Sequence, residues 1–228
     1  EEAFRAGHEA KHAENYRINS FHLGEGSPKQ KFRANMDAIY TLKTLENQHR
    51  DATPEEQETL ANYVGWGGLA DAFDAEKTAW AGEYKELKAA LTEEEYAAAR
   101  ASTLNAHYTS PTVIRAIYEA LDGMGFEKGN ILEPSMGVGN FFGMLPDSML
   151  GSRLYGVELD SITGRIAQKL YPQAEIKVAG FETTDRRDFY DLAVGNVPFG
   201  NYRVSDKPYD KLGFSIHNYF FAKALDQV

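Results

Sequence analysis

Residues 130–141 of the chain read NILEPSMGVGNF. A short apolar run that ends in a carboxylate, Glu133, is typical of a buried strand. After this carboxylate in the sequence, Gly137 and Gly139 let the backbone pass close to a ligand. The helix expected next presents its N-terminus to the same ligand. The stretch therefore predicts a strand, a ligand-binding loop and a helix, in that order.

Similar runs follow along the chain. We predict strands at residues 130–133, 153–158, 175–178 and 190–194, with helical segments between them and a last helix at 215–228. Strands that alternate with helices indicate a parallel sheet with flanking helices, an α/β fold. Ligands of such sheets bind beyond the carboxyl ends of the strands, so the residues that close each strand are the candidate site.

The first hundred or so residues have a helical pattern instead. Helix start signals, which are N-caps, first-turn prolines and capping boxes, stand at Ser27-Pro28, Thr53-Pro54-Glu55-Glu56, Thr92-Glu93-Glu94-Glu95 and Ser110-Pro111. The character of the sequence changes near His107. We therefore predict a helical N-terminal region at residues 1–104 and an α/β region at residues 105–228.

The composition narrows the class of protein. The chain has 228 residues, 43% of them hydrophobic, and no cysteine, which excludes disulfides, thiolate metal sites and cysteine nucleophiles. It shows no signal peptide and no apolar run near the roughly 20 residues that span a bilayer, so we predict a soluble, cytoplasmic protein without membrane contact. The net charge of −10 argues against this chain holding nucleic acid by itself, because such binding relies on Lys and Arg at phosphates. Since the chain starts without methionine and stops inside a helical pattern, we expect a piece of a longer polypeptide.

Carboxylates close two of the predicted strands. Glu133 suits an ammonium-bearing ligand better than a pyrophosphate, and the next glycine comes one residue too late for a dinucleotide-binding fingerprint. Glu158 can accept both hydroxyls of a ribose, in NAD as well as in S-adenosyl-L-methionine (SAM), although a solvated acidic residue is the plainer alternative. After the third strand, Phe181 and Glu182 are suited to sandwich an adenine ring and to accept its amino hydrogens.

The fourth predicted strand ends in VGNVPFGNY, residues 194–202. In isolation, an Asn-x-Pro turn after a strand is an equally good interpretation. Beside three other loops that suit a nucleoside-containing ligand, the stretch is better explained as part of the same site.

Four stretches together resemble the N6-adenine DNA methyltransferase family. They are NAHYTSP (105–111), LEPSMGVGNF (132–141), GVELD (156–160) and GNVPFG (195–200). Two others, YVGWGGLADAF (63–73) and HNYFFAKALD (217–226), are similar to large methyltransferase–helicase proteins of conjugative elements and phages. The resemblance implies a Rossmann-like SAM-methyltransferase fold, of which residues 105–228 are the N-terminal half, truncated after the fourth strand and its helix.

The resemblance also implies SAM as the cofactor, and no metal. The cofactor contacts it implies are Tyr108, Thr109, Glu133, Pro134, Ser135, Gly137, Gly139, Asn140, Phe141, Glu158, Leu159, Phe181 and Glu182. The third-strand loop departs from the family pattern, since Gly180 stands where many relatives have an acid. Either Glu182 takes that role or the contact is missing.

The catalytic residues implied by the resemblance are Asn196, Val197, Pro198 and Phe199. The amide oxygen of Asn196 and the carbonyl of Val197 accept the hydrogens of an exocyclic amine, which helps it become nucleophilic, while the Phe199 ring stacks on a flipped base. The family has proline where this chain has Val197. Valine keeps the carbonyl and loses only the fixed φ of proline, so we expect the loop to remain competent.

Three alternatives stay open for the function. The acceptor is adenine in DNA, or RNA adenine or a protein glutamine amide, or the chain is a non-catalytic SAM- or DNA-associated module. As partners we expect DNA, contacted mostly through regions outside this chain, the remaining methyltransferase strands and a helicase part. We also expect the fourth strand to expose a pairing edge, and the piece alone to bind SAM weakly and not to methylate DNA.

Three further signals have ordinary explanations. The stretch HEAKH (8–12) matches a zinc-protease pattern but lies among charged residues near a terminus. The loop Gly65-Trp66-Gly67-Gly68 lines a pocket, with Trp66 packed on cofactor or base, or, in the simpler interpretation, stops a helix and buries its tryptophan. Arg203, Lys207 and Lys211 meet phosphate or belong to a solvated loop.

Overall fold

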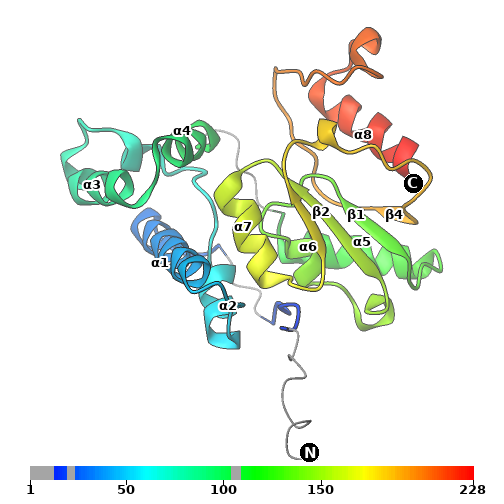
Figure 1. The fold of residues 1–228 in the computed structure, drawn as a ribbon, viewed down its shortest axis with the longest axis horizontal. Helices are drawn as coiled ribbons and strands as arrows, with labels where there is room; N and C mark the ends of the chain where they lie inside the picture. The colour runs from blue at the N-terminus through cyan, green and yellow to red at the C-terminus, as the bar shows by residue number, and fades with distance from the viewer. Residues whose placement is uncertain (1–12, 20–23, 104–108) are drawn as a thin grey trace, which may run out of the picture.

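The computed structural model describes residues 13–19, 24–103 and 109–228 (Figure 1). Its sheet has four parallel strands in the order β3-β2-β1-β4. They are β1 (Asn130–Glu133), β2 (Arg153–Glu158), β3 (Glu175–Val178) and β4 (Leu192–Ala193). The predicted α/β fold, a parallel sheet with flanking helices preceded by a helical region, is confirmed.

The first three strands have the predicted bounds, whereas the fourth is shorter than the predicted 190–194. The amides of Phe189 and Tyr190 each donate, at 2.9 Å, to the carbonyl of Gln227 rather than to β1. Pairing with β1 begins only at the next residue, where the Asp191 amide donates to the Asn130 carbonyl. The chain end thus takes the hydrogen bonds that would have lengthened β4.

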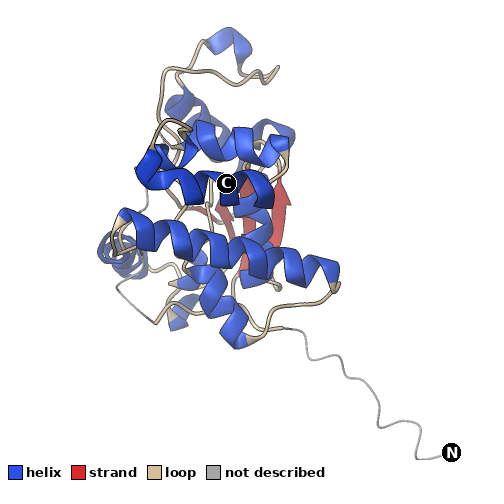
Figure 2. Cartoon of the chain, turned by 90° about the vertical axis from the view of Figure 1, so that its left-hand side faces the viewer, coloured by secondary structure: helices blue, strands red, loops and turns tan. Residues whose placement is uncertain are grey.

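Both faces of the central strand β1 are buried, as expected of a parallel strand, whereas β3 at the sheet edge exposes Glu175 and Lys177. Side chains alternate between the faces, so Ile131 belongs to one hydrophobic cluster and Leu132 to the other. The Ile131 face is covered by α5 (Pro111–Gly123), α6 (Asn140–Gly143) and α7 (Ser161–Leu170). The Leu132 face is covered by α8 (Ile216–Gln227), and Figure 2 shows the strands enclosed among helices.

The helix predicted after the glycine loop is only one turn long, α6. Pro146 stops it, because the residue before a proline is disfavoured in helical conformation and proline has no amide to donate. The described residues also form short 3-10 helices, at Ala70–Phe73, Thr78–Trp80, Asp147–Met149, Phe181–Thr183 and Asp210–Leu212. Within the described ranges, no helix is both long and apolar enough to cross a membrane.

Three N-terminal helices begin at predicted capping signals. They are α1 (Pro28–Asn47), α2 (Pro54–Ala61) and α4 (Glu93–Ser102). The helix α3 (Ala81–Ala90) was not among the predicted starts and begins after Trp80 without a side-chain cap. Complete capping boxes start α1, α2 and α4. Helices α1 and α2 pack on α7, beside the sheet (Figure 1), and one continuous hydrophobic cluster joins them to it.

Trp66 is part of this core. Its side chain is 1% exposed, and its ring makes edge contacts with Phe32, Tyr63 and Phe73 at 5.3–6.4 Å between centroids. Trp66 is therefore a buried core residue, which was the simpler interpretation of the glycine-flanked tryptophan.

An ion network ties the N-terminal helices to α7. Arg165 of α7 pairs with Glu46 of α1 at 2.7 Å and with Glu95 of α4 at 2.9 Å, and Lys43 reaches Glu95 at 3.0 Å. Burial pushes the pKa of Glu95 upward, but the hydrogen bonds from Arg165, the Thr92 amide and Lys43 outweigh it and lower the pKa to about 2. The ionised carboxylate of Glu95 therefore joins α4, α1 and α7.

Replacing this carboxylate tests its contribution. We expect Glu95→Gln to lower the free energy of unfolding at pH 7 by about 2 kcal/mol, the usual scale for hydrogen bonds to charged groups. The native pKa of Glu95 is depressed, so as pH falls from about 4.5 to about 2 the unfolded chain is protonated at Glu95 while the folded chain is still ionised. The extra stability of the parent over the variant is therefore lost across this range. Urea titrations across this pH range measure it. The matched control is Glu94→Gln, at an exposed neighbour on the same helical turn, and an equal effect of both variants would contradict the prediction.

Candidate functional site

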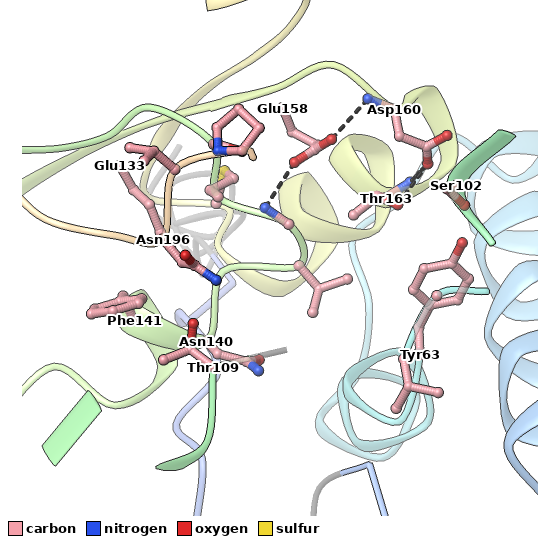
Figure 3. A pocket seen from close by; sticks show the side chains of 18 of the residues that line it. Tyr63, Ser102, Thr109, Glu133, Asn140, Phe141, Glu158, Asp160, Thr163 and Asn196 are labelled. Atoms are coloured by element: carbon pink, nitrogen blue, oxygen red, sulfur yellow. Dashed lines mark hydrogen bonds between the residues drawn. The ribbon is translucent and has the colours of Figure 1, made fainter. Parts of the chain in front are cut away.

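A cavity of about 270 Å³ lies at the carboxyl edge of the sheet (Figure 3). Its volume is close to the lower end of the roughly 300–1,000 Å³ of small-molecule sites. Three walls come from the loops after β1, β2 and β4, and a fourth comes from the N-terminal helical region. The residues that line it are Tyr63, Val64, Gly65, Ser102, Thr109, Glu133, Ser135, Met136, Gly137, Val138, Asn140, Phe141, Glu158, Asp160, Thr163, Asn196, Val197, Pro198 and Phe199.

Glu133 ends β1 with a carboxylate that is only 2% exposed. Its Oε2 atom has no hydrogen-bond partner in the structure. Gly195 passes directly over it with φ +151°, and a Cβ there would stand 3.1 Å from Glu133 Cγ, so the close approach requires glycine. Burial, and to a lesser extent the charge of Glu158, raise the pKa of Glu133 well above its ordinary value. A buried acceptor of this kind suits a cationic donor.

Glu158 ends β2 and is held by backbone amides. Its Oε2 accepts from the Gly137 amide and its Oε1 from the Asp160 amide, both at 2.8 Å. Burial raises the pKa of Glu158, while these hydrogen bonds act in the opposite direction. Gly137 itself has φ +57° and no atom within 4 Å of the position of a Cβ, which leaves open space for a ligand beside its backbone. Each Glu158 oxygen retains a second lone pair for a further donor.

Asp160 lines the cavity and also holds the start of a helix. It is the N-cap of α7, and its Oδ1 accepts from the amide of Thr163 at 2.8 Å and from its hydroxyl at 2.6 Å. The cap fixes the start of α7, and with it the loop that carries Glu158.

The loop after β4 presents Asn196 and Phe199 at the rim of the cavity. Asn196 is exposed, and Phe199 is 58% exposed. One face of the Phe199 ring stacks on His217 of α8, with 5.6 Å between centroids and 27° between planes. Val197 is half-buried and packs against the cluster under α8, which anchors the loop between these two residues.

The structure brings most of the predicted site residues to this one cavity. Those that line it are Thr109, Glu133, Ser135, Gly137, Asn140, Phe141, Glu158, Asn196, Val197, Pro198 and Phe199. Five others do not line it: Pro134, Gly139, Leu159, Phe181 and Glu182. Tyr108 lies outside the described residues.

The reasons differ for four of those five. Gly139 is needed for packing, because a Cβ there would collide with the ring of Tyr171. Leu159 is 75% exposed to solvent. Phe181 is 2% exposed and stacks on Phe220 of α8 at 5.0 Å, so its ring is used in the core. The Glu182 carboxylate folds back over Gly180.

Sequence analysis missed most of one wall of the cavity, since it offered Gly65 as pocket-lining but not Tyr63, Val64 or Ser102. It also missed Asp160, the N-cap of α7, and Thr163 of α7. It also missed Met136 and Val138, although both stand in the glycine loop. The glycine-rich stretch at 65–68 was a signal for the wall, but it drew attention to Trp66 instead of the residues before it. Among the described residues no cluster of His, Asp or Glu suits a metal, and the pair His8 and His12 lies outside them.

No protein-family model matches the chain. The chain is 28% identical over 211 residues, 90% of its length, to the Defense against restriction protein B of Escherichia phage P1. Over 92 residues, 40% of its length, it is 34% identical to the Type II methyltransferase M.CvrRI of Paramecium bursaria Chlorella virus XZ-6E. The chain has a methyltransferase among its relatives.

The predicted resemblance to methyltransferases is thereby confirmed. The chain spans 8% of the length of the phage P1 relative and 24% of the length of the chlorella virus relative. A solved structure from Listeria monocytogenes, provisionally assigned as a class I S-adenosylmethionine-dependent methyltransferase, aligns with a TM-score of 0.41 at 12% identity. That alignment covers 86% of this chain and 69% of the other.

The buried Glu133 carboxylate predicts a pH dependence of the ligand-free chain. Because its native pKa is raised, the folded state keeps a proton that the unfolded state releases above about pH 4.5, and stability falls as pH rises through this window. Glu133→Gln does not titrate. We therefore expect its urea midpoint, relative to the parent, to increase steadily between pH 4.5 and 7. The control is Glu175→Gln, an exposed residue that begins β3 at the end of the strand away from the cavity. The prediction is contradicted if the difference in urea midpoint from the parent is independent of pH for both variants.

Proposed function

We propose that this chain is the cofactor-binding and catalytic part of a SAM-dependent methyltransferase that acts on the N6 amino group of adenine in DNA. The observation that carries the proposal is the convergence of Glu133, Glu158 and Asn196, from three strand ends, on one cavity. The methyltransferase relative supports the reaction class. In this proposal residues 1–104 form the helical N-terminal region and residues 105–228 the methyltransferase part.

The residues of the cavity fit SAM. The unpartnered Oε2 of Glu133 is placed to accept from the methionine ammonium group, and both charges of that pair would be desolvated together. The free lone pairs of Glu158 suit the two ribose hydroxyls, and the open side of Gly137 leaves room for the ligand. Thr109 and Asn140 lie near Asn196 in Figure 3, on the side of the cavity assigned to the methionine group. When bound, SAM supplies an electrophilic methyl group.

The loop after β4 supplies the groups that activate the acceptor. The lone pair of an exocyclic amine is conjugated into the base, and two acceptors on its hydrogens favour the tetrahedral form that attacks the methyl group. The Asn196 side-chain oxygen and the Val197 carbonyl are these acceptors. The exposed face of Phe199 stacks on the extruded base, while His217 supports the ring from the opposite side.

DNA is held mainly by other parts of the protein in this proposal. The net charge of −10 leaves this chain poorly suited to grip a phosphate backbone alone. Among the described strands β4 pairs only with β1, so its other edge is open to a further strand. We propose that the remaining methyltransferase strands cover this edge and that a helicase part belongs to the same cytoplasmic protein.

Calorimetry tests the cofactor. SAM should bind the chain, and Glu133→Gln should weaken binding about tenfold or more, because it removes the charge opposite the ammonium group. The raised pKa of Glu133 also predicts that SAM binding near neutral pH releases a proton, which Glu133→Gln abolishes. Titrations in buffers of different ionisation enthalpy measure this proton. Absence of heat from the parent chain would contradict the proposed cofactor.

Methyl transfer tests the reaction. With tritiated SAM and unmethylated DNA, the full-length protein should label N6 of adenine. We expect Asn196→Ala to lower the rate by about 100-fold or more, the scale for losing one group that stabilises developing charge, with SAM affinity unchanged. Asn201→Ala, in the same loop but away from the cavity, is the matched control.

The acceptors used in the assay separate the alternatives. Label in RNA or in a glutamine-containing peptide, and none in DNA, would assign a different amine. No transfer to any acceptor, with SAM binding intact, would leave a non-catalytic SAM-associated module.

A further inference from the structure

The cavity extends beyond the groups assigned so far. In Figure 3, Glu133 and Asn196 lie at one side of it, Glu158 lies in the middle, and Thr163, Ser102 and Tyr63 lie at the other side. Ser102 comes from the end of α4, and Tyr63 from the loop after α2. The far end of the cavity is thus built by the helical region that precedes the α/β part.

The shape of SAM orders its parts along such a cavity. Its methionine and adenine groups are attached to opposite sides of the ribose. With the ammonium group at Glu133 and the ribose at Glu158, the adenine therefore extends past Glu158, away from Asn196. This direction leads to the start of α7 and to Ser102 and Tyr63.

The loop after β3, where sequence analysis expected the adenine contacts, does not reach the cavity. Phe181 is buried in the cluster under α8, with Lys223 above its ring at 5.3 Å. Neither Phe181 nor Glu182 borders the cavity. The base must therefore find its contacts elsewhere.

The wall at the far end is held in place by a buried amide. Asn35 of α1 is 0% exposed. Its Oδ1 accepts from the Val64 amide at 2.8 Å, and its Nδ2 donates to the Gly65 carbonyl at 2.6 Å. Tyr63 is 2% exposed, with its ring edge-on to Trp66. Both polar ends of one buried side chain thus fix the loop at 63–65 against α1.

Ser102 is fixed as well. Its hydroxyl donates to the Ala99 carbonyl at 2.8 Å, and the Arg165–Glu95 pair joins its helix to α7. A rigid wall with an aromatic ring and a hydroxyl suits a flat purine better than a flexible chain.

We propose that Tyr63 and Ser102 form the nucleobase end of the cofactor site, so that the helical N-terminal region holds the adenine of SAM. The inference rests on the proposed function, since it takes SAM as the ligand. It assigns the helical region a part in cofactor recognition and assigns Asn35 the role of positioning the loop that carries Tyr63.

Photolabelling tests the location of the base without any variant. The chain is irradiated with SAM that carries an azide on its adenine ring and is then digested with trypsin. We expect label in the peptide of residues 51–77, which contains Tyr63, and loss of that label with excess SAM. SAM-protected label in the peptide of residues 178–186, which contains Phe181, would overturn the inference while leaving the proposed cofactor intact. Absence of any SAM-protected label would instead contradict the proposed function itself.

Two adjacent substitutions provide the second test. Ser102→Leu places a larger side chain at the wall, and we expect it to weaken SAM binding about tenfold or more in calorimetry. Thr103→Leu is the matched control, because Thr103 makes the same kind of hydroxyl-to-carbonyl bond, to Arg100, and does not line the cavity. Its affinity should stay within about twofold of the parent. Unchanged SAM affinity in a folded Ser102→Leu chain, checked by its thermal transition, would overturn the inference.

Discussion

The parallel pairing of β1 with both of its neighbours is the constraint on which the rest of the structure depends. Since β2 and β4 both run parallel to β1, the residues that end these strands meet at one edge of the sheet. Glu133, Glu158 and Asn196 are far apart in the sequence, and no local pattern would join them. The sheet order makes their loops neighbours at the edge where the cavity lies.

The cavity brings two carboxylates out of water, and the protein treats them differently. Glu158 is satisfied by two backbone amides, which belong to its own turn and to the glycine loop. Glu133 keeps an oxygen without a partner, and such a group costs free energy unless a donor arrives. This contrast explains why Glu133 is the group whose ionisation should respond most to a bound cation.

The helical N-terminal region is joined to the sheet by both packing and charge. A continuous hydrophobic cluster runs from α1 and α2 through α7 to β1, and Arg165 links α7 to Glu46 and Glu95. Asn35 then fixes the loop after α2 at the far end of the cavity. The same contacts that stabilise the fold therefore place a wall of the candidate site.

The sequence by itself determined the elements and most of the loops. Three strands have their predicted bounds, and the predicted capping boxes start α2 and α4, because these features depend on residues within a few positions of one another. The glycine loop, Glu158 and the Asn196 loop were identified for the same reason, since each directly follows a strand.

Only the tertiary structure decided which neighbours those loops have. It shortened β4 because Gln227 took the amides before it, and it placed Phe181 in the core under α8. It also brought Tyr63 and Ser102 to the cavity through the packing of α1 and α4 around α7. Such contacts join residues far apart in the chain, and they depend on how whole helices pack, which a local pattern does not encode.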